Sequence, residues 1–188
     1  MDRSFYTRDP AVVARDLLGK VIVRLLEGEF LSGRIVETEA YFGGLDPASR
    51  AFRGRKNYNA VMFEQPGRLF VYMVHGWWLL NVIAHPQGKV GAVLIRALEP
   101  LGGVEHMERR RDKRDVRELA SGPGKLSQAF AVTKALNGLD VTQRDSELIV
   151  VAGEGKSCKI STSRRIGVTK DLPRDLRFYL GNSEFTSR

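Results

Sequence analysis

The most informative segment of the chain reads Gly33-Arg34-Ile35-Val36-Glu37-Thr38-Glu39-Ala40-Tyr41. Its β-branched and apolar residues predict an extended strand, in which successive side chains point to opposite faces. Glu37 and Glu39 therefore share one face, with their Cα atoms roughly 6.6 Å apart at the usual strand rise. Such a pair fits the two carboxylates of a glycoside hydrolase, and a solvated strand face is the alternative.

Helix and strand signals alternate along the rest of the chain. Asp9-Pro10 predicts the start of a helix that ends before Gly19. Lys20–Leu26 predicts a strand that pairs with the glutamate-bearing segment as a hairpin, and Glu99-Pro100 is expected to end a strand that begins at Val90. The other expected elements are strands at Leu148–Ala152, Arg165–Thr169 and Leu176–Leu180 and a helix at Lys125–Ala135, whereas the interrupted stretch after Tyr41 is expected to be irregular.

A second hairpin is predicted by the apolar runs Leu69–Val74 and Trp77–Ala84, which His75-Gly76 joins. Hairpins interleaved with helices predict an α+β fold: a curved, mostly antiparallel sheet with flanking helices and a protruding β-hairpin. The hairpin tip carries His75 and Trp77, and exposed rings there suit a wedge that unstacks a base step in the minor groove. A chain of 188 residues, 43% of them hydrophobic, is expected to form a single domain over 1–188.

The distribution of charge points to an anionic partner. The formal net charge is +8 and the isoelectric point is about 9.9. Residues 50–56 contain four cations and no acid, and residues 156–170 contain five cations and no acid, so both segments are candidate phosphate clamps. Acids nearly cancel the cations of residues 105–118, which we interpret as a solvated helix face.

Several classes of protein are not expected from this sequence. The chain has no apolar run of about 18 residues and no secretory signal at its start, so we expect a soluble intracellular protein with no membrane partner. Cys158 is the single cysteine, and no cysteine or histidine spacing is typical of a zinc site. We therefore expect no disulfide, no metal and a reducing compartment.

Several long motifs occur in order between about Ala11 and Leu180. They comprise the glutamate-bearing segment, Asn59–Phe63, Pro66-Gly67 leading to Val71-Tyr72, Asn81-Val82, Leu94–Pro100 and Ser121–Leu126. Together these motifs resemble the 3-methyladenine (alkyladenine) DNA glycosylase family, and the resemblance covers nearly the whole chain.

The resemblance implies roles for individual residues. Glu39 matches the catalytic acid that positions and deprotonates the attacking water, and Arg96 matches the arginine that helps to hold this water and the DNA backbone. Tyr41 and Tyr72 match the aromatic pair that sandwiches the flipped base, so a cavity just large enough for a purine is expected between them. Asn81 matches the asparagine at the pocket floor.

The chemistry of the substrate agrees with these implied roles. Methylation at N3 or N7 gives a purine a positive charge, which makes it a better leaving group and a good partner for aromatic ring faces. No lysine falls on the matched pocket positions, so water is the expected nucleophile and the strand is not nicked. The resemblance implies a monofunctional DNA repair glycosylase that needs no cofactor, acts as a monomer and binds double-stranded DNA containing damaged purines. The expected backbone contacts are Arg53, Arg55, Lys56 and Lys125.

The chain departs from the family pattern at three places. Arg50 stands where the base pocket usually has a histidine, His75 where the wedge is usually a tyrosine, and Lys56-Asn57-Tyr58 where a threonine-proline-arginine run is usual. A guanidinium facing a cationic methylpurine is repulsive. Either the Arg50 side chain points to phosphate, or the preferred lesion is neutral, such as deaminated adenine.

Two other functions are compatible with parts of the sequence. A non-catalytic nucleic-acid-binding module would use the aromatic residues as stacking platforms and would leave Glu39 structural. A carbohydrate hydrolase would need Glu37 as much as Glu39, whereas we expect Glu37 to be mostly structural. For the glycosylase, the expected location is the nucleoid-containing cytoplasm of a prokaryote or the nucleus of a eukaryote.

Overall fold

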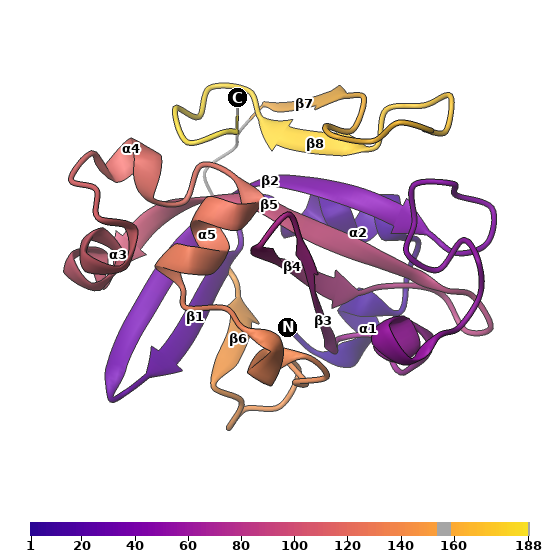
Figure 1. Cartoon of the computed structure of the whole chain (residues 1–188), viewed down its shortest axis with the longest axis horizontal. Helices are drawn as coiled ribbons and strands as arrows, with labels where there is room; N and C mark the ends of the chain where they lie inside the picture. The colour runs from indigo at the N-terminus through magenta and orange to yellow at the C-terminus, as the bar shows by residue number, and fades with distance from the viewer. Residues whose placement is uncertain (154–158, 188) are drawn as a thin grey trace.

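The computed structural model describes residues 1–153 and 159–187, which fold around one curled antiparallel sheet (Figure 1). The main path of the sheet runs β3-β4-β5-β2-β1-β6, and β8 pairs with both β2 and β7. The predicted α+β fold with a curved antiparallel sheet is confirmed. The strands are β1 (Val21–Leu26), β2 (Glu29–Phe42), β3 (Leu69–Val74), β4 (Trp77–Ile83), β5 (Gly91–Gly102), β6 (Leu148–Val151), β7 (Ile160–Ser163) and β8 (Arg177–Leu180).

Short helices cover the sheet, and Figure 1 shows α3, α4 and α5 gathered near one end of it. The predicted helix at Asp9-Pro10 is α2: the Asp9 side chain accepts a hydrogen bond from the Ala11 N–H, and the helix ends at Leu17 before Gly19. It packs on β2, where the Thr38 hydroxyl donates to the Ala14 carbonyl at 2.8 Å. The helices are α1 (Arg3–Tyr6), α2 (Pro10–Leu17), α3 (Val104–Arg111), α4 (Val116–Leu119) and α5 (Pro123–Ala129), with 3₁₀ helices η1 (Asn57–Phe63) and η2 (Lys134–Leu136).

Strand β2 is the centre of the sheet because it pairs with three other strands. Its first half pairs with β1, almost its whole length pairs with β5, and residues 37–39 also pair with β8. The register against β5 shifts on both sides of Glu37, which marks a β-bulge and bends the strand. Glu37 and Glu39 are therefore enclosed by strands on both edges.

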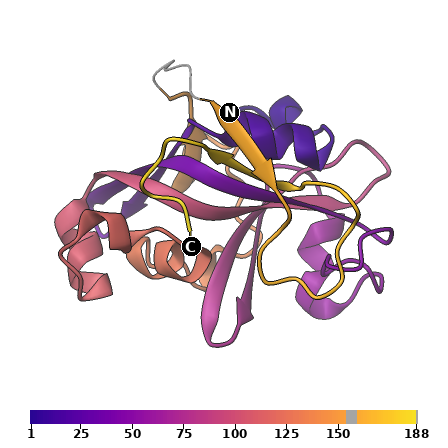
Figure 2. The ribbon, with the colours of Figure 1, turned by 90° about the horizontal axis from the view of Figure 1, so that it is seen from above.

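The predicted second hairpin is confirmed by the pairing of β3 with β4. Val74 pairs with Trp77, and the two turn residues His75 and Gly76 have φ angles of 49° and 82°, as a tight two-residue turn requires. Figure 2 shows the hairpin extending beyond the rest of the sheet. At its tip Trp77 is 51% exposed.

Several predicted boundaries were wrong. Strand β5 continues through Glu99-Pro100 to Gly102, because Pro100 pairs opposite Gly33 next to a register shift, where a missing N–H is tolerated. The helix predicted at 125–135 stops at Ala129, and Ala131 has a φ of 49°. Residues 165–169 form no strand, residues 57–63 form a 3₁₀ helix inside the expected irregular stretch, and residues 105–118 form two helices that break at Asp112.

The apolar side chains form two clusters. The larger one lies between the sheet and the helices and includes Val13, Ile35 and Leu98. The smaller one holds Met62 and Phe70 together with Ala51, Ile83 and Ala92, and it lies where the loop after β2 covers β3, β4 and β5. No helix within the described residues has the length and apolar character needed to cross a membrane.

Candidate active site

Glu39 lies at the centre of a buried polar cluster, and its side chain has no exposed surface. The Tyr41 hydroxyl donates to its Oε2 at 2.7 Å, and the Ile166 backbone N–H donates to its Oε1 at 2.8 Å. The Arg96 Nη1 lies 3.2 Å from the same Oε1. These contacts fix the orientation of the carboxylate inside the protein.

Burial raises the pKa of Glu39 above its ordinary value, although the charge of Arg96 and the hydrogen bonds from Ile166 and Tyr41 oppose the shift. Burial alone would lower the pKa of Arg96, but the charges of Glu39 and Glu37 outweigh it and raise that pKa. Arg96 is therefore a fixed cation. A carboxylate with a raised pKa accepts a proton more readily, as a general base must.

Glu37 shares the face of Glu39, as the alternation of the strand predicted, but its surroundings differ. Its Oε1 accepts from the Arg96 Nε at 2.8 Å, the Arg177 Nε at 2.7 Å and the Ser187 hydroxyl at 2.7 Å, and its Oε2 accepts from the Ser187 N–H at 2.6 Å. Burial favours the neutral acid, but the hydrogen bonds from Arg177 and Ser187 and the charge of Arg96 lower the pKa of Glu37.

The hydrogen bonds to Glu37 argue against a carbohydrate hydrolase in which Glu37 and Glu39 are both catalytic. Both oxygens of Glu37 are occupied by donors, so it is neither a free nucleophile nor a proton donor. The geometry supports the expectation that Glu37 has no direct chemical role.

The predicted base-pocket residues Tyr41, Arg50, Tyr72 and Asn81 line one small cavity. Its volume is about 10 Å³, which holds about one water. The prediction of a purine-sized cavity between Tyr41 and Tyr72 was therefore wrong, because the cavity in this structure is far smaller than a purine. The Arg50 guanidinium carbon lies 4.8 Å from the centre of the Tyr72 ring, so Arg50 stacks on this wall instead of pointing away from the pocket.

Stacking and a hydrogen bond hold Tyr72 and Asn81 in the wall of this small cavity. Tyr72 stacks on Phe70 with ring centres 4.9 Å apart, and the Asn81 side-chain amide donates to the Phe70 carbonyl at 3.0 Å. Burial raises the pKa of both Tyr41 and Tyr72, so both phenols are neutral. Tyr41 joins the cavity to the carboxylate, because its ring lines the cavity while its hydroxyl contacts Glu39.

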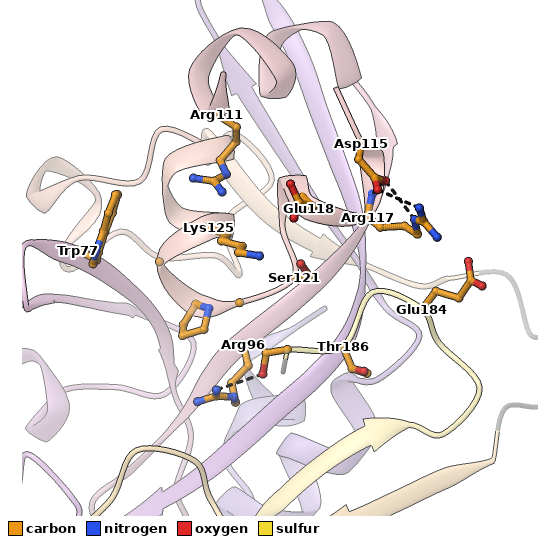
Figure 3. Close-up of a pocket in the computed structure, with 14 residues that line it drawn as sticks. Trp77, Arg96, Arg111, Asp115, Arg117, Glu118, Ser121, Lys125, Glu184 and Thr186 are labelled. Carbon is orange, nitrogen blue, oxygen red and sulfur yellow. Dashed lines mark hydrogen bonds and ion pairs between the residues drawn. The ribbon is translucent and has the colours of Figure 1, made fainter. Parts of the chain in front are cut away.

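A second cavity, of about 840 Å³, opens beside Arg96 (Figure 3). The hairpin tip contributes Trp77, α5 contributes Lys125, and the last described residues contribute Ser187. The charged side chains on its walls have both signs, and neither Tyr41 nor Tyr72 reaches it. The small cavity, with its paired tyrosines, is therefore the candidate base site, and the large one is an adjoining groove.

The predicted DNA-contacting residues lie on accessible surfaces. Arg53, Arg55 and Lys56 are exposed on the loop before η1, and Lys125 lines the large cavity. His75 is exposed at the tip of the hairpin, next to Trp77. The structure thus places a basic loop and an aromatic hairpin tip at the surface.

Within the candidate phosphate clamp at residues 156–170, Arg165 is not available to DNA, whereas Lys159, Arg164 and Lys170 are exposed. Arg165 has a fully buried side chain and binds both oxygens of Asp46, at 2.7 and 2.8 Å, and Asp171 at 2.6 Å. Its guanidinium also stacks on the Tyr41 ring at 4.5 Å. Arg165 therefore supports the pocket wall, while Lys156 and Cys158 lie outside the described residues.

The sequence interpretation missed residues from the end of the chain. Ile166 supplies the N–H to Glu39, and Arg177 and Ser187 complete the cluster around Glu37. The one sequence signal near Ile166 was the glycine that follows it, because glycine favours a bend over a strand. In the structure Gly167 has a φ of 74°. Among the described residues, no group of three or more histidine, cysteine, aspartate or glutamate side chains could hold a metal ion.

Comparison with known proteins gives a consistent result. The family model described as Methylpurine-DNA glycosylase (MPG) matches residues 4–184. Relatives named "Putative 3-methyladenine DNA glycosylase" include those of Koribacter versatilis, 41% identical over 100% of this chain and 92% of the relative, and of Methanocella arvoryzae, 46% identical over 100% and 96%. The corresponding protein of Carboxydothermus hydrogenoformans is 43% identical over 100% of this chain and 98% of its own length. The chain thus belongs to the methylpurine-DNA glycosylase family, a family of DNA repair hydrolases.

Proposed function

We propose that this protein excises alkylated purines from double-stranded DNA with a water activated by Glu39, leaving an abasic site. One observation carries the proposal: Tyr41 joins a buried carboxylate of raised pKa to a cavity walled by tyrosines. Glu39 accepts a proton from the attacking water, and its charge stabilises the oxocarbenium-like sugar left by the departing base. Arg96, whose Nη1 lies 3.2 Å from Glu39, helps to hold this water.

The damaged nucleotide swings out of the duplex and enters between Tyr41 and Tyr72. A positively charged methylpurine is attracted to these electron-rich ring faces. The small cavity has to open first, so Arg50 leaves the Tyr72 ring as the base enters. His75 fills the gap in the duplex, supported by Trp77, which lies against Gly124 of α5.

The reaction ends at the abasic site. Strand cleavage by a glycosylase requires an amine nucleophile, and the described residues that line the small cavity include no lysine. We propose water as the nucleophile and a monofunctional enzyme. Glu39, Arg96 and both tyrosines come from one chain, so a monomer suffices, and its place is with the DNA, in the nucleoid-containing cytoplasm of a prokaryote or in a nucleus.

Release of free base separates this proposal from a non-catalytic binding module. Duplex DNA treated with a methylating agent is incubated with the protein, and the small molecules are separated by chromatography. The enzyme liberates methylpurines, whereas a module that only stacks bases on its aromatic residues liberates nothing.

Arg50 is expected to set the preference among lesions. Its guanidinium repels a cationic methylpurine but can donate hydrogen bonds to neutral hypoxanthine, the base of deaminated adenine. Arg50→His should raise the excision of 7-methylguanine relative to hypoxanthine by about tenfold, the effect of roughly 1.4 kcal/mol. Single-turnover rates at pH 8 on two matched duplexes measure this ratio. Arg53→His, on the exposed loop nearby, is the matched control, and an unchanged ratio in Arg50→His would contradict the assignment.

The basic loop is expected to bind DNA without regard to damage. Replacing Arg53, Arg55 and Lys56 together by alanine should weaken binding to damaged and undamaged duplexes equally. The slope of log Kd against log salt should fall by about 0.9 for each phosphate that the variant no longer neutralises. Titrations at several salt concentrations give both quantities.

A control for the basic loop removes the same charge elsewhere. Alanine at Arg109, Lys113 and Arg114 removes three exposed cations from the surface around α3. This triple variant should keep the salt slope of the unmodified protein. Equal effects of both triple variants would mean that net charge, and not the loop, drives binding.

A further inference from the structure

We propose that Ser187 is a positioning residue for base excision: it acts through Glu37 to hold the Arg96 guanidinium against Glu39. The inference rests on the proposed function of Glu39 and Arg96, and adds a residue about 150 positions away from Glu37 in the sequence. The family resemblance assigned no role to this segment.

The contacts of Ser187 connect it to both ends of the buried ion cluster. Its N–H donates to the Oε2 of Glu37 at 2.6 Å and its hydroxyl donates to the Oε1 of Glu37 at 2.7 Å. The same hydroxyl accepts from the Arg96 Nη2 at 3.2 Å, the bond drawn in Figure 3. Ser187 therefore touches the carboxylate and the cation together.

Each nitrogen of the Arg96 side chain has a separate partner. Its Nε donates to Glu37 at 2.8 Å, its Nη2 donates to Ser187 at 3.2 Å, and its Nη1 lies 3.2 Å from Glu39. A planar guanidinium held at two of its nitrogens cannot rotate without breaking a bond. The position of Nη1 against Glu39 is thus set by Glu37 and Ser187 on the opposite side.

Arg177 anchors Ser187 from strand β8. Its Nε donates to the Oε1 of Glu37 at 2.7 Å, and its Nη2 donates to the Ser187 carbonyl at 3.4 Å. In addition, its Nη1 donates to the hydroxyl of Ser163 at 3.1 Å on strand β7. Both the N–H and the carbonyl of Ser187 are therefore hydrogen-bonded, and these two bonds fix the position of its hydroxyl beside Arg96.

Ser187 also stands between the large cavity and the ion cluster. Ser187 and Arg96 line the cavity of about 840 Å³, whereas Glu37 has no exposed surface. Ser187 itself is 9% exposed, so its removal would admit water to Glu37 and weaken the low-dielectric attraction that holds Arg96.

Removal of the Ser187 hydroxyl should slow the chemical step without weakening DNA binding. In Ser187→Ala, the single-turnover rate of 3-methyladenine release should fall by roughly tenfold, because small misplacements of a catalytic group are costly. The Kd for a duplex containing a stable abasic-site analogue should stay within about twofold, since Ser187 and Arg96 are buried. Rates measured with saturating enzyme separate these two effects.

The pH profile gives a readout that a purely structural role would not move. The charge of Arg96 opposes the upward shift in the pKa of Glu39, so a misplaced Arg96 lets this pKa rise further. The base works when deprotonated, and the rising limb of the rate against pH should therefore move to higher pH in Ser187→Ala. The other ionisable groups at Glu39 are Glu37 and Tyr41 on its own strand, Arg177 opposite it on β8, and Tyr72 across the small cavity. The acid limb belongs to Glu39, because the pKa of Glu37 is lowered and the tyrosines titrate far above it.

Two further variants make the test decisive. Ser183→Ala removes a hydroxyl that bonds only the nearby Phe185 N–H among the described residues, and should behave as the unmodified protein. Ser187→Thr keeps the hydroxyl and should restore both the rate and the pH profile. Ser187→Ala with an unmodified rate and pH profile, or a slower rate with an unmoved profile, would overturn the positioning role.

The outcome for the unmodified protein separates the two proposals. If it releases 3-methyladenine but Ser187→Ala is indistinguishable from it, the positioning role fails alone. If it releases no base at all, the proposed function fails and the positioning role falls with it.

Discussion

Glu39→Gln is expected to abolish base release while the affinity for damaged duplex DNA stays within about twofold of the unmodified protein. The amide can keep the contacts that hold the carboxylate: its oxygen accepts from Ile166 and Arg96, and its NH₂ group faces the Tyr41 oxygen. It cannot accept a proton from water, and it carries no charge to stabilise the sugar cation. The loss of a general base costs about 10² to 10⁴ in rate, and the missing charge adds to this.

Single-turnover release of 3-methyladenine, measured beside binding to the same duplex, tests this expectation. Glu29→Gln is the matched control, because it makes the same chemical change at an exposed glutamate on the β1–β2 hairpin. It should retain the unmodified rate. Glu39→Gln with an unmodified rate would remove Glu39 from the mechanism.

Arg165→Met is expected to destabilise the fold strongly. The change leaves Asp46, which has no exposed surface, and the nearly buried Asp171 without their shared guanidinium. Breaking a buried pair in this way costs about 3–5 kcal/mol. For a protein of this size, the melting temperature should fall by roughly 6–20 °C. Calorimetry or circular dichroism at neutral pH measures the shift.

The neighbouring arginine provides the control. The Arg164 side chain is 51% exposed and lies 3.5 Å from the same Asp171, so Arg164→Met should cost no more than about 1 kcal/mol. Both variants lose one positive charge, so a difference between their melting temperatures reports the burial of Arg165. If both variants melted at the same temperature, the buried contacts of Arg165 would not matter to stability.

Local patterns predicted much of the fold because they depend on neighbouring residues. The alternation around Glu37 and Glu39 placed both side chains on one face, where both contact Arg96. The capping aspartate before Pro10 predicted α2, and His75-Gly76 predicted the β3–β4 turn. These signals need only the short-range geometry of helices and strands.

Contacts between distant parts of the chain were not predictable. Arg165 stands in an acid-free basic segment that suggested a phosphate clamp, yet its partner Asp46 comes 119 positions earlier. The serine at 187 shows nothing locally that indicates a partner 150 positions away. Strand β8 pairs with β2 at Glu37 and Glu39. This pairing depends on how the whole sheet curls, which a local sequence pattern does not predict.

The volume of the base site also could not be predicted from the sequence. Tyr41 and Tyr72 line the same cavity, but the volume between them depends on where the Arg50 side chain lies. A long arginine has many rotamers of similar energy, and packing selects among them. Pro100 similarly suggested the end of a strand, because the register shift that accommodates it arises from the partner strand.

The central claim is that a water activated by one buried carboxylate cuts the bond between sugar and damaged base. The most direct test follows a duplex with a single 3-methyladenine and an end label, quenched at intervals after mixing with the protein. The account predicts that free 3-methyladenine appears in step with abasic sites, while the labelled strand stays full length until alkali is added. A strand that breaks as the base leaves, or a duplex that is bound with its base still attached, would contradict it.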